Sequence, residues 1–337
     1  MLPPRPSTLM AKRALIGALV LAQLLLFLLV GAVAAISFSG SPGGLAGGGG
    51  SVLLTVYTGT ATIQRAGATV PVVAHSGDTL AAGDAVRTGA ASKAGVSYPD
   101  GSLTRLDSDT RVVVSSVRAA GGAVKTSLQQ SAGLTWNQVK SLVGGSTFKV
   151  SGPNSAVAEV RGTRFGYYVE RDAGGNPVIW IDVWDGVVRV SGAIGSPVTA
   201  GSGQRVTVRP ASAPTAPAAI PAADRQLSFT VFNRTIEAVT GTPVAFANGT
   251  SSTGDTSTSF PVTADGRGDL QLVLGWPGST FELTVVDPSG KVFSRSTSAQ
   301  APLSVVAKRA RAGRWTFIVR DIQSGPNEAW WVIVGRA

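Results

Sequence analysis

The sequence contains no cysteine, which excludes disulfides, thiolate nucleophiles and cysteine-ligated metals. Its only histidine is His75, so a multi-histidine metal site cannot form and a Ser–His–Asp triad has a single candidate base. Phosphate-binding G-x-x-x-x-G-K-[ST] and dinucleotide-binding G-x-G-x-x-G patterns are also missing. The residues therefore predict a protein that is not an enzyme and uses no metal or cofactor. A hydrolase built on paired aspartates is the least favoured alternative.

Charged residues are scarce, at 14%, whereas glycine occurs 42 times. This composition argues against long helices and favours short strands joined by turns. The 29 basic residues outnumber the 19 acidic ones, and a basic balance can indicate nucleic-acid binding. For an exported chain we instead expect no nucleic acid, and favour an envelope protein, anionic wall polymer or lipid headgroups as partners. Surface charge that only maintains solubility is the alternative.

One long apolar run, residues 14–36, contains no charged residue. As a helix it would extend about 34 Å, enough to cross a hydrocarbon core of roughly 30 Å. Arg5, Lys12 and Arg13 precede it, so the positive-inside rule places the tail, residues 1–13, in the cytoplasm. The sequence thus predicts a single-pass membrane protein whose bulk lies outside the cytoplasm.

A cleaved signal peptide is the competing interpretation of this run. Residues 32–34 (AVA) are small enough for cleavage, but the run is longer than a typical signal-peptide core, which favours a retained anchor. In both cases the remainder of the chain is exported. Residues 37–50 are rich in Gly and Ser and predict a flexible linker.

The next part, residues 51–208, consists of short apolar or alternating runs separated by turn signals. In residues 178–190, Val, Ile and Trp alternate with other residues, as in strands with one buried face. Asp100-Gly101 and Asp185-Gly186 are typical tight turns. We therefore expect an all-β module with stacked or sandwich-like sheets.

Four motifs occur in order within this module: AGDAVRTGAAS (82–92), PDGSLTRL (99–106), VSGPNSAVAEVRGTRF (150–165) and VWDGVVRV (183–190). Together they resemble the FecR domain family. The resemblance implies an extracytoplasmic module that senses or relays a signal across a membrane, and some members of the family control a sigma factor. Because only about 13 residues precede the predicted helix, too few for a folded domain, we expect the domain and its location without the sigma-factor role.

The motif residues have a structural and a functional interpretation. Glycines are expected at positive φ or where the backbone is crowded: Gly83, Gly89, Gly101 and Gly162. Aspartates are expected to accept hydrogen bonds from turn amides and to pair with Arg87 or Arg161: Asp84, Asp100 and Asp107. The functional alternative is that Arg87, Arg161 and Arg164 form an anion-binding patch.

Residues 209–225 are rich in Pro and Ala and predict a semi-extended linker. In residues 226–248, Phe229, Phe232 and Ile236 recur at helical spacing. This predicts a short connecting helix that docks on a neighbouring domain, followed by a loop. A helix lying on the membrane surface is the alternative.

The last part, residues 249–337, begins with a polar stretch at 251–260, expected to be a loop, and continues with alternating runs separated by turns such as 287–290 (DPSG). It resembles the C-terminal β-sandwich appended to secreted bacterial peptidases, the pre-peptidase C-terminal domain, which implies an antiparallel sandwich with an accessory role. Four aromatic residues are expected to fill its core: Trp276, Phe281, Trp315 and Phe317. An exposed carbohydrate platform at Trp330 and Trp331 is an alternative.

A basic cluster precedes the penultimate expected strand: Lys308, Arg309, Arg311 and Arg314. It predicts either a solvated loop or a contact with anionic polymer or headgroups. Taken together, the sequence predicts a membrane-anchored, extracytoplasmic binding or signal-relay module at the cell envelope. The alternative is a structural cell-surface scaffold that binds anionic wall polymer or an envelope partner.

Overall fold

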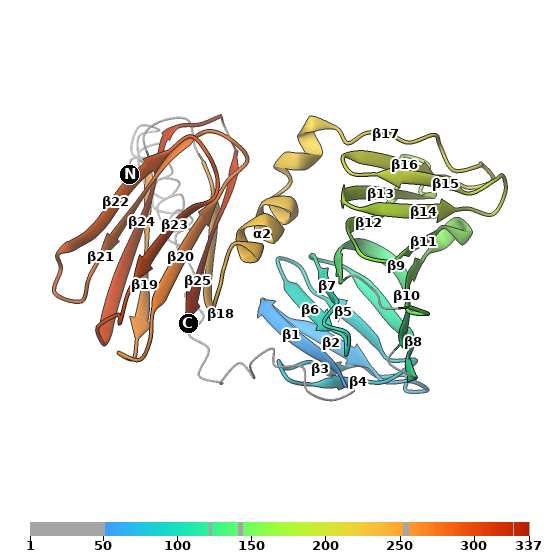
Figure 1. Ribbon diagram of the computed structural model, residues 1–337, viewed down its shortest axis with the longest axis horizontal. Helices are drawn as coiled ribbons and strands as arrows, with labels where there is room; N and C mark the ends of the chain where they lie inside the picture. Colours follow the sequence, from blue (N-terminus) through green and yellow to red (C-terminus); the bar gives the residue numbers. More distant parts are fainter. Residues whose placement is uncertain (1–50, 121–122, 141–143, 252–255, 326, 337) are drawn as a thin grey trace, which may run out of the picture.

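The computed structural model describes residues 51–120, 123–140, 144–251, 256–325 and 327–336. Figure 1 shows two strand-rich modules with the helix α2 (Ser228–Glu237) between them. Within the described ranges, no helix has both the length and the apolar character to cross a bilayer. The expected cytoplasmic tail, membrane span and Gly/Ser linker, residues 1–50, lie outside the described residues.

The first module, residues 51–208, is built almost entirely from strands. They are β1 (Val52–Thr58), β2 (Ala61–Gln64), β3 (Val72–Val73), β4 (Thr79–Leu80), β5 (Ala85–Thr88), β6 (Lys93–Ser97), β7 (Leu103–Leu106), β8 (Arg111–Ala120), β9 (Ala123–Val139), β10 (Thr147–Ser151), β11 (Val157–Val160), β12 (Thr163–Arg171), β13 (Pro177–Asp185), β14 (Val187–Ser191), β15 (Val198–Gly201) and β16 (Gln204–Val208), with a 3-10 turn η1 (Pro153–Ser155). The all-β prediction for this module is confirmed.

These strands form two sheets that share β9. One sheet runs β4-β1-β6-β7-β9-β12-β13-β16, and the other runs β3-β2-β5-β8-β9-β10-β11-β14-β15. The first half of β9 pairs with β8 and, in parallel, with β10, and its second half pairs with β7 and β12. The sequence motifs did not predict this long strand, which joins the two sheets at their centre.

The apolar faces of the two sheets form one core. Leu54, Ile63 and Phe148 are completely buried in it. Alternation explains the choice of face: in β14, Val188 and Val190 are buried, whereas Val187 is exposed. The stacked or sandwich-like arrangement that the sequence predicted is therefore present.

The Pro/Ala segment, residues 209–225, does not form a free spacer. It contributes the strand β17 (Ala218–Ala219), which extends the first sheet by pairing with β16, and the 3-10 helix η2 (Ala222–Gln226). Ile220 is buried, and its amide donates to the carbonyl of Gly203. Burial of Ile220 at the sheet edge thus fixes the segment in place, although its composition predicted an extended linker.

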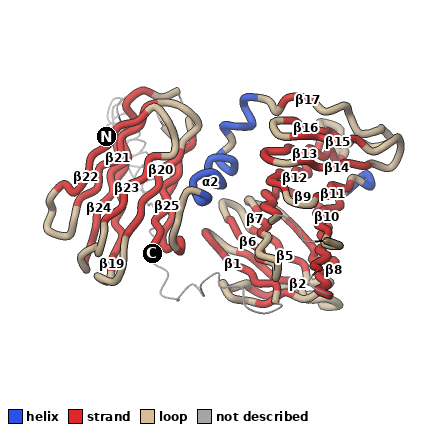
Figure 2. Tube along the Cα trace, in the orientation of Figure 1, coloured by secondary structure: helices blue, strands red, loops and turns tan. Residues whose placement is uncertain are grey.

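The second module, residues 242–336, is an antiparallel sandwich of two four-stranded sheets, β18-β25-β20-β23 and β19-β24-β21-β22. Its strands are β18 (Thr242–Thr250), β19 (Ser257–Ala264), β20 (Leu270–Gly275), β21 (Thr280–Val286), β22 (Val292–Ser298), β23 (Leu303–Ala307), β24 (Gly313–Gln323) and β25 (Ala329–Arg336). Figure 2 shows α2 and η2 as the helical segments between this sandwich and the first module.

Two boundaries in this region differ from the prediction. The sandwich begins at Thr242 rather than at residue 249, because the expected loop pairs with β25 as strand β18. The polar stretch expected as a loop includes Ser257–Phe260, which lies in β19 and pairs with β24. In both places the composition failed to predict a strand, because a strand at a half-exposed position tolerates polar and small residues.

Asp84 anchors the turn that precedes β5 in the first module. It is buried and accepts hydrogen bonds from the amides of Ala66, at 2.9 Å, and Ala81, at 3.0 Å, and from Arg65 Nη1, at 2.7 Å. Burial alone raises the pKa of Asp84, but these bonds to the carboxylate outweigh it, so the pKa lies below its usual value. The ionised side chain therefore stabilises the folded state.

We predict that Asp84→Asn lowers the free energy of unfolding by about 1–3 kcal/mol at neutral pH, because an amide replaces a hydrogen-bonded carboxylate. A depressed pKa contributes stability above the unfolded-state pKa and loses it as pH falls through the folded-state pKa. The difference between the two proteins should therefore shrink in acid, as measured by urea denaturation of the full chain in detergent. The control is Asp109→Asn, an exposed position at φ 53° that asparagine adopts readily. A deficit that stays constant down to acid pH would contradict the prediction.

Candidate functional site

Helix α2 carries the residues that join the two modules. Its predicted apolar positions, Phe229, Phe232 and Ile236, are all buried. Phe232 lies 5.8 Å from the ring of Tyr57 in β1 and 4.9 Å from the ring of Trp331 in β25. The helix therefore contacts both modules, which confirms the expectation of a docked connecting helix.

A buried lysine of the first module faces these aromatic rings. The ammonium group of Lys93, in β6, lies 5.1 Å from the Phe229 ring, 5.4 Å from the Phe232 ring and 5.3 Å from the Trp331 ring. Its charge is balanced by an ion pair with Asp107. A cation–π contact contributes from about 0.5 kcal/mol at an exposed site to about 2 kcal/mol when it is desolvated. Lys93 thus links one module to the helix and to the other module at a single point.

The last residue of α2, Glu237, is held by three side chains of the first module. Its carboxylate accepts hydrogen bonds from Arg105 Nη1 at 3.3 Å, Trp136 Nε1 at 2.9 Å and Arg164 Nη1 at 3.1 Å. These donors come from the neighbouring strands β7, β9 and β12. Arg105 also donates to Asn233, one turn earlier in α2, at 3.2 Å. We call Arg105, Trp136, Arg164 and Glu237 the α2 clamp.

The clamp corrects an electrostatic mismatch at the end of the helix. A carboxylate at a helix C-terminus is unfavourable, because the helix dipole is negative there. Arg105 and Arg164 supply the opposite charge to Glu237, and the Glu237 side chain is only 14% exposed. Arg164 is also paired with Asp185 at 3.1 Å. Burial alone lowers the pKa of Arg164, but Asp185 and Glu237 raise it overall.

The structure does not gather the three arginines of the hypothetical anion patch. Arg164 is paired with two carboxylates, Glu237 of the clamp and Asp185. Arg87, in β5, and Arg161, in the turn after β11, are exposed, and their side chains make no hydrogen bond or ion pair with another described residue. Strands β5 and β11 are separated by β8, β9 and β10, a distance of about 19 Å across the sheet. A single pocket of all three arginines is therefore not formed.

The other motif residues mostly occupy the expected positions. Gly83, Gly101 and Gly162 have positive φ, and a Cβ on Gly89 would lie 2.7 Å from Thr60 Oγ1. Asp84 and Asp100 accept turn amides, as expected. Two expectations are wrong: Asp107 pairs with Lys93, and Asp84 pairs with Arg65 rather than with Arg87 or Arg161. Arg65 and Lys93 lie outside the turns that contain Asp84 and Asp107, so the local turn patterns did not indicate these pairs.

In the second module the predicted core aromatics are buried as expected: Trp276, Phe281, Trp315 and Phe317. The alternative of an exposed platform at Trp330 and Trp331 is wrong, because the two side chains are only 4% and 3% exposed. They do point to opposite faces of β25, as adjacent strand residues must. Trp330 fills the sandwich core, whereas Trp331 faces α2 and donates to Ser228 Oγ at 3.0 Å.

The basic cluster of the second module is exposed throughout: Lys308, Arg309, Arg311 and Arg314. Lys308 is paired with Asp269 at 2.6 Å, and the Arg309 amide donates to the same carboxylate. Lys308 Nζ and the Arg309 amide lower the pKa of Asp269. One acid thus neutralises one of four cations, and contact with an anionic partner stays a prediction.

We predict that Glu237→Gln lowers the free energy of unfolding by about 3 kcal/mol, because Arg105 stays buried without a counter-charge while Trp136 keeps an acceptor. Urea denaturation of the full chain in detergent measures the loss, and limited proteolysis near α2 should become faster. The control is Glu159→Gln, which breaks the partly exposed pair with Lys149 at 3.5 Å and should cost at most about 1 kcal/mol. Equal losses for the two variants would contradict a special role for the clamp.

A comparison with family models places a FecR family match, described as FecR protein, on residues 84–189. This segment runs from the end of the Asp84 turn into β14 and contains three of the four clamp residues, Arg105, Trp136 and Arg164. It also contains Lys93. A search of curated proteins found no match.

Solved structures show only distant likeness. Two crystal structures of a candidate anti-sigma factor from Parabacteroides distasonis are 15% and 16% identical, with TM-scores of 0.34 and 0.33. In both cases the match covers 44% of this chain and 64% of the other, so the chain spans less than two thirds of their length. A GH31 alpha-xylosidase from Xanthomonas citri is 10% identical with a TM-score of 0.19, and the match covers 75% of this chain and 31% of that one. These values establish no shared overall arrangement.

Proposed function

Residues 84–189 form a FecR domain, and from this premise we propose that the chain is a non-enzymatic binding or signal-relay module of the cell envelope. In this proposal residues 14–36 anchor the chain in the membrane, and both modules lie outside the cytoplasm. The single observation that carries the proposal is that the FecR domain supplies three of the four clamp residues, all of which bind Glu237 of α2. The domain thereby determines where the second module sits.

The contacts suggest how a binding event in one module would reach the other. Helix α2 touches the FecR domain through Glu237 and the second module through Phe232 and Trp331. A partner that displaces Arg105 or Arg164 from Glu237 would remove the charge that holds the helix end. The orientation of the second module would then change without any chemical reaction.

A structural scaffold that binds anionic wall polymer is the second candidate. The exposed basic cluster of the second module favours it, because three of its cations have no described acidic partner within an ion-pair distance: Arg309, Arg311 and Arg314. Clustered, exposed cations attract polyanions in a salt-dependent way. The resemblance of the second module to a pre-peptidase C-terminal domain stays a prediction and agrees with an accessory role.

The absence of cysteine from the sequence permits a clean test of location. We predict that Thr69→Cys, an exposed position in the first module, reacts with a membrane-impermeant maleimide in intact cells. Ser7→Cys, in the expected cytoplasmic tail, should react only after the cells are opened. Labelling is measured by the mass increase of the purified chain. Labelling of Ser7→Cys but not Thr69→Cys in intact cells would reject the proposed orientation.

Partner capture from membranes separates the two candidate functions. A relay module should retain one envelope protein in saturable amounts, and Glu237→Gln should change that retention. A scaffold should bind wall polymer, and replacing Arg309, Arg311 and Arg314 with Gln should abolish binding, as should salt near 1 M, where the Debye length falls to about 3 Å. Binding of polymer that resists both treatments would contradict the scaffold.

A further inference from the structure

The outward side of the sheet β3-β2-β5-β8-β9-β10-β11-β14-β15 is strongly basic. Its apolar side chains face the core, and the residues that alternate with them point outward. The outward positions of its described strands hold one acidic residue, Glu159, and six basic ones: Arg87, Arg111, Arg118, Lys125, Lys149 and Arg189. In register, Glu159 lies between Lys149 and Arg189. The unbalanced charge is therefore concentrated on β5, β8 and β9.

The four cations of these three strands form two pairs of like charge. Arg87 is directly opposite Arg111, and Arg118 is directly opposite Lys125. Their side chains make no hydrogen bond or ion pair with another described residue. Like charges at opposite positions of an antiparallel pair are destabilising, and an anionic partner would relieve the repulsion. We call Arg87, Arg111, Arg118 and Lys125 the basic face.

Exposed valines lie at the edge of the same sheet. The strand β3 and the turn before it contribute three, with large exposed fractions: Val70 72%, Val72 51% and Val73 66%. Val73 is in register with Thr62, Thr62 with Arg87, and Arg87 with Arg111. Three strand spacings put Val73 about 14 Å from Arg111. The valine edge, Val70, Val72 and Val73, thus continues the basic face.

The described chain also begins beside the basic face. Ser51 lines a small cavity together with Val114 and Val117 of β8, the strand that carries Arg111 and Arg118. In the proposed function, residues 37–50 link Ser51 to the membrane anchor. A flexible linker of this length has an average end-to-end distance of about 20 Å. The basic face therefore stays near the lipid surface.

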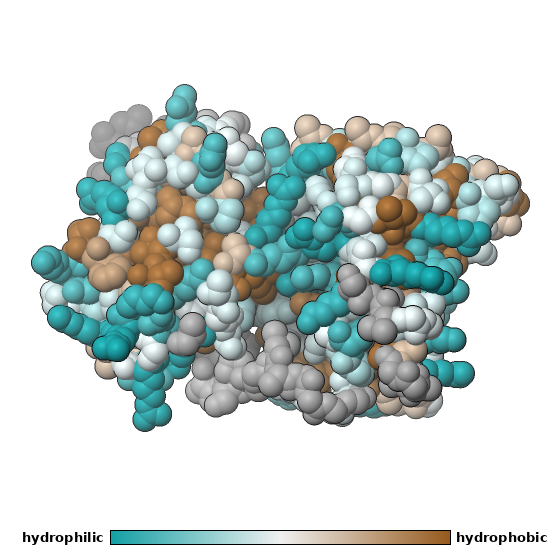
Figure 3. Space-filling view, in the orientation of Figure 1, coloured by the Kyte–Doolittle hydropathy of each residue, from teal (hydrophilic) through white to brown (hydrophobic). Residues whose placement is uncertain are grey.

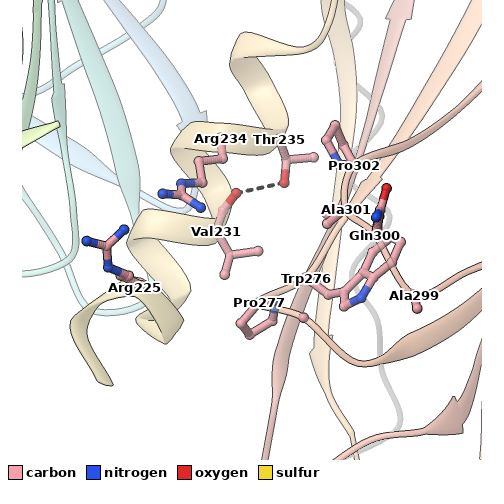
Figure 4. Close-up of a pocket in the computed structure, with 12 residues that line it drawn as sticks. Arg225, Val231, Arg234, Thr235, Trp276, Pro277, Ala299, Gln300, Ala301 and Pro302 are labelled. Carbon is pink, nitrogen blue, oxygen red and sulfur yellow. Dashed lines mark hydrogen bonds between the residues drawn. The ribbon is translucent and has the colours of Figure 1, made fainter. Parts of the chain in front are cut away.

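The surroundings of α2 lack this combination. A half-open cavity of about 380 Å³ lies beside the helix. In Figure 4, Arg225 and Arg234 extend to one side of α2, whereas Trp276 and Pro302 lie on the other side. No single partner contacts both these cations and that apolar wall. On the first module, by contrast, Val73 and the basic face share one side of one sheet.

We propose that the basic face and the valine edge dock the first module on an anionic lipid bilayer. The cations contact headgroup phosphates, and the valines enter the boundary between headgroups and acyl chains. The inference rests on the membrane anchor of the proposed function, because the tether raises the local concentration of lipid and weak docking then suffices. A linear polyanion matches the charge equally well, but it would leave the valines in water.

A dye attached to Thr69→Cys tests the docking, because Thr69 is exposed and next to the valine edge. The full chain is reconstituted into vesicles of phosphatidylcholine with or without phosphatidylglycerol. With phosphatidylglycerol the dye should become brighter and resist an aqueous quencher, whereas pure phosphatidylcholine should leave it quenchable. Docked and free states exchange, so the Thr69→Cys thiol still reacts with an impermeant maleimide in intact cells, only more slowly.

Replacing three exposed cations of the basic face together should abolish this protection: Arg87→Gln, Arg118→Gln and Lys125→Gln. Each cation near an anionic surface contributes about fivefold, so the ratio of docked to free chain should fall about 100-fold. Circular dichroism should show that this variant is folded.

The matched control removes the same charge from exposed positions of the second module and should leave the dye signal unchanged: Arg309→Gln, Arg311→Gln and Arg314→Gln. A dye on Thr297→Cys in β22, at the far side of the second module in Figure 1, should stay quenchable in both lipids. An equal loss of protection in the two triple variants would overturn the proposal.

Flotation of the vesicles tests the anchor separately. A chain that floats with both vesicle types but shows no lipid-dependent change in the Thr69→Cys dye overturns the docking alone, and a chain that floats with neither overturns the anchor as well. Long-chain polyphosphate is the remaining probe. If it binds the basic face on neutral vesicles while phosphatidylglycerol has no effect, the partner is a polymer and the bilayer proposal is overturned.

Discussion

The arrangement of the two modules depends on a buried helix with a charged end. Helix α2 has ten residues, shorter than the roughly 12–15 that an isolated helix needs to be even marginally stable in water. Its stability must therefore come from burial of Phe229, Phe232 and Ile236 and from the clamp at Glu237. Hydrophilic side chains gather over the junction of the modules in Figure 3, while the apolar side of α2 is buried beneath them. The helix therefore depends on these tertiary contacts for its stability.

The first module can hold this helix because its two sheets share β9. That strand lies at the centre of both sheets, and its second half places Trp136 beside Arg105 of β7 in direct register. Arg164 follows in β12, on the other side of the same strand. Three donors on three hydrogen-bonded strands have little freedom to move relative to one another, so they present a preformed site to Glu237. A clamp built on loops would lose more side-chain and backbone entropy on binding.

Local patterns in the sequence predicted the strands and the helix well, but they predicted contacts between distant residues poorly. Alternation located strands such as β13 and β14, and the spacing of Phe229, Phe232 and Ile236 located α2. The clamp escaped prediction because Glu237 lies 132 residues after Arg105, and no periodicity relates them. The tryptophan pair in β25 shows the same limit. Strand geometry predicted that the two side chains point to opposite faces of β25. Only the fold shows that both side chains are buried.

Glu237, the last residue of α2, is a poor choice for an isolated helix, and the fold explains why it is present. In isolation this residue opposes the helix dipole, and a sequence chosen only for helix stability would have a basic residue there. The unfavourable choice becomes favourable once Arg105 and Arg164 surround the carboxylate. Conflicts between local preference and observed structure tend to occur where a protein does its work. Loss of these charges would weaken the hold of the first module on the end of α2, while the packing of Phe232 against Trp331 would still join the helix to the second module.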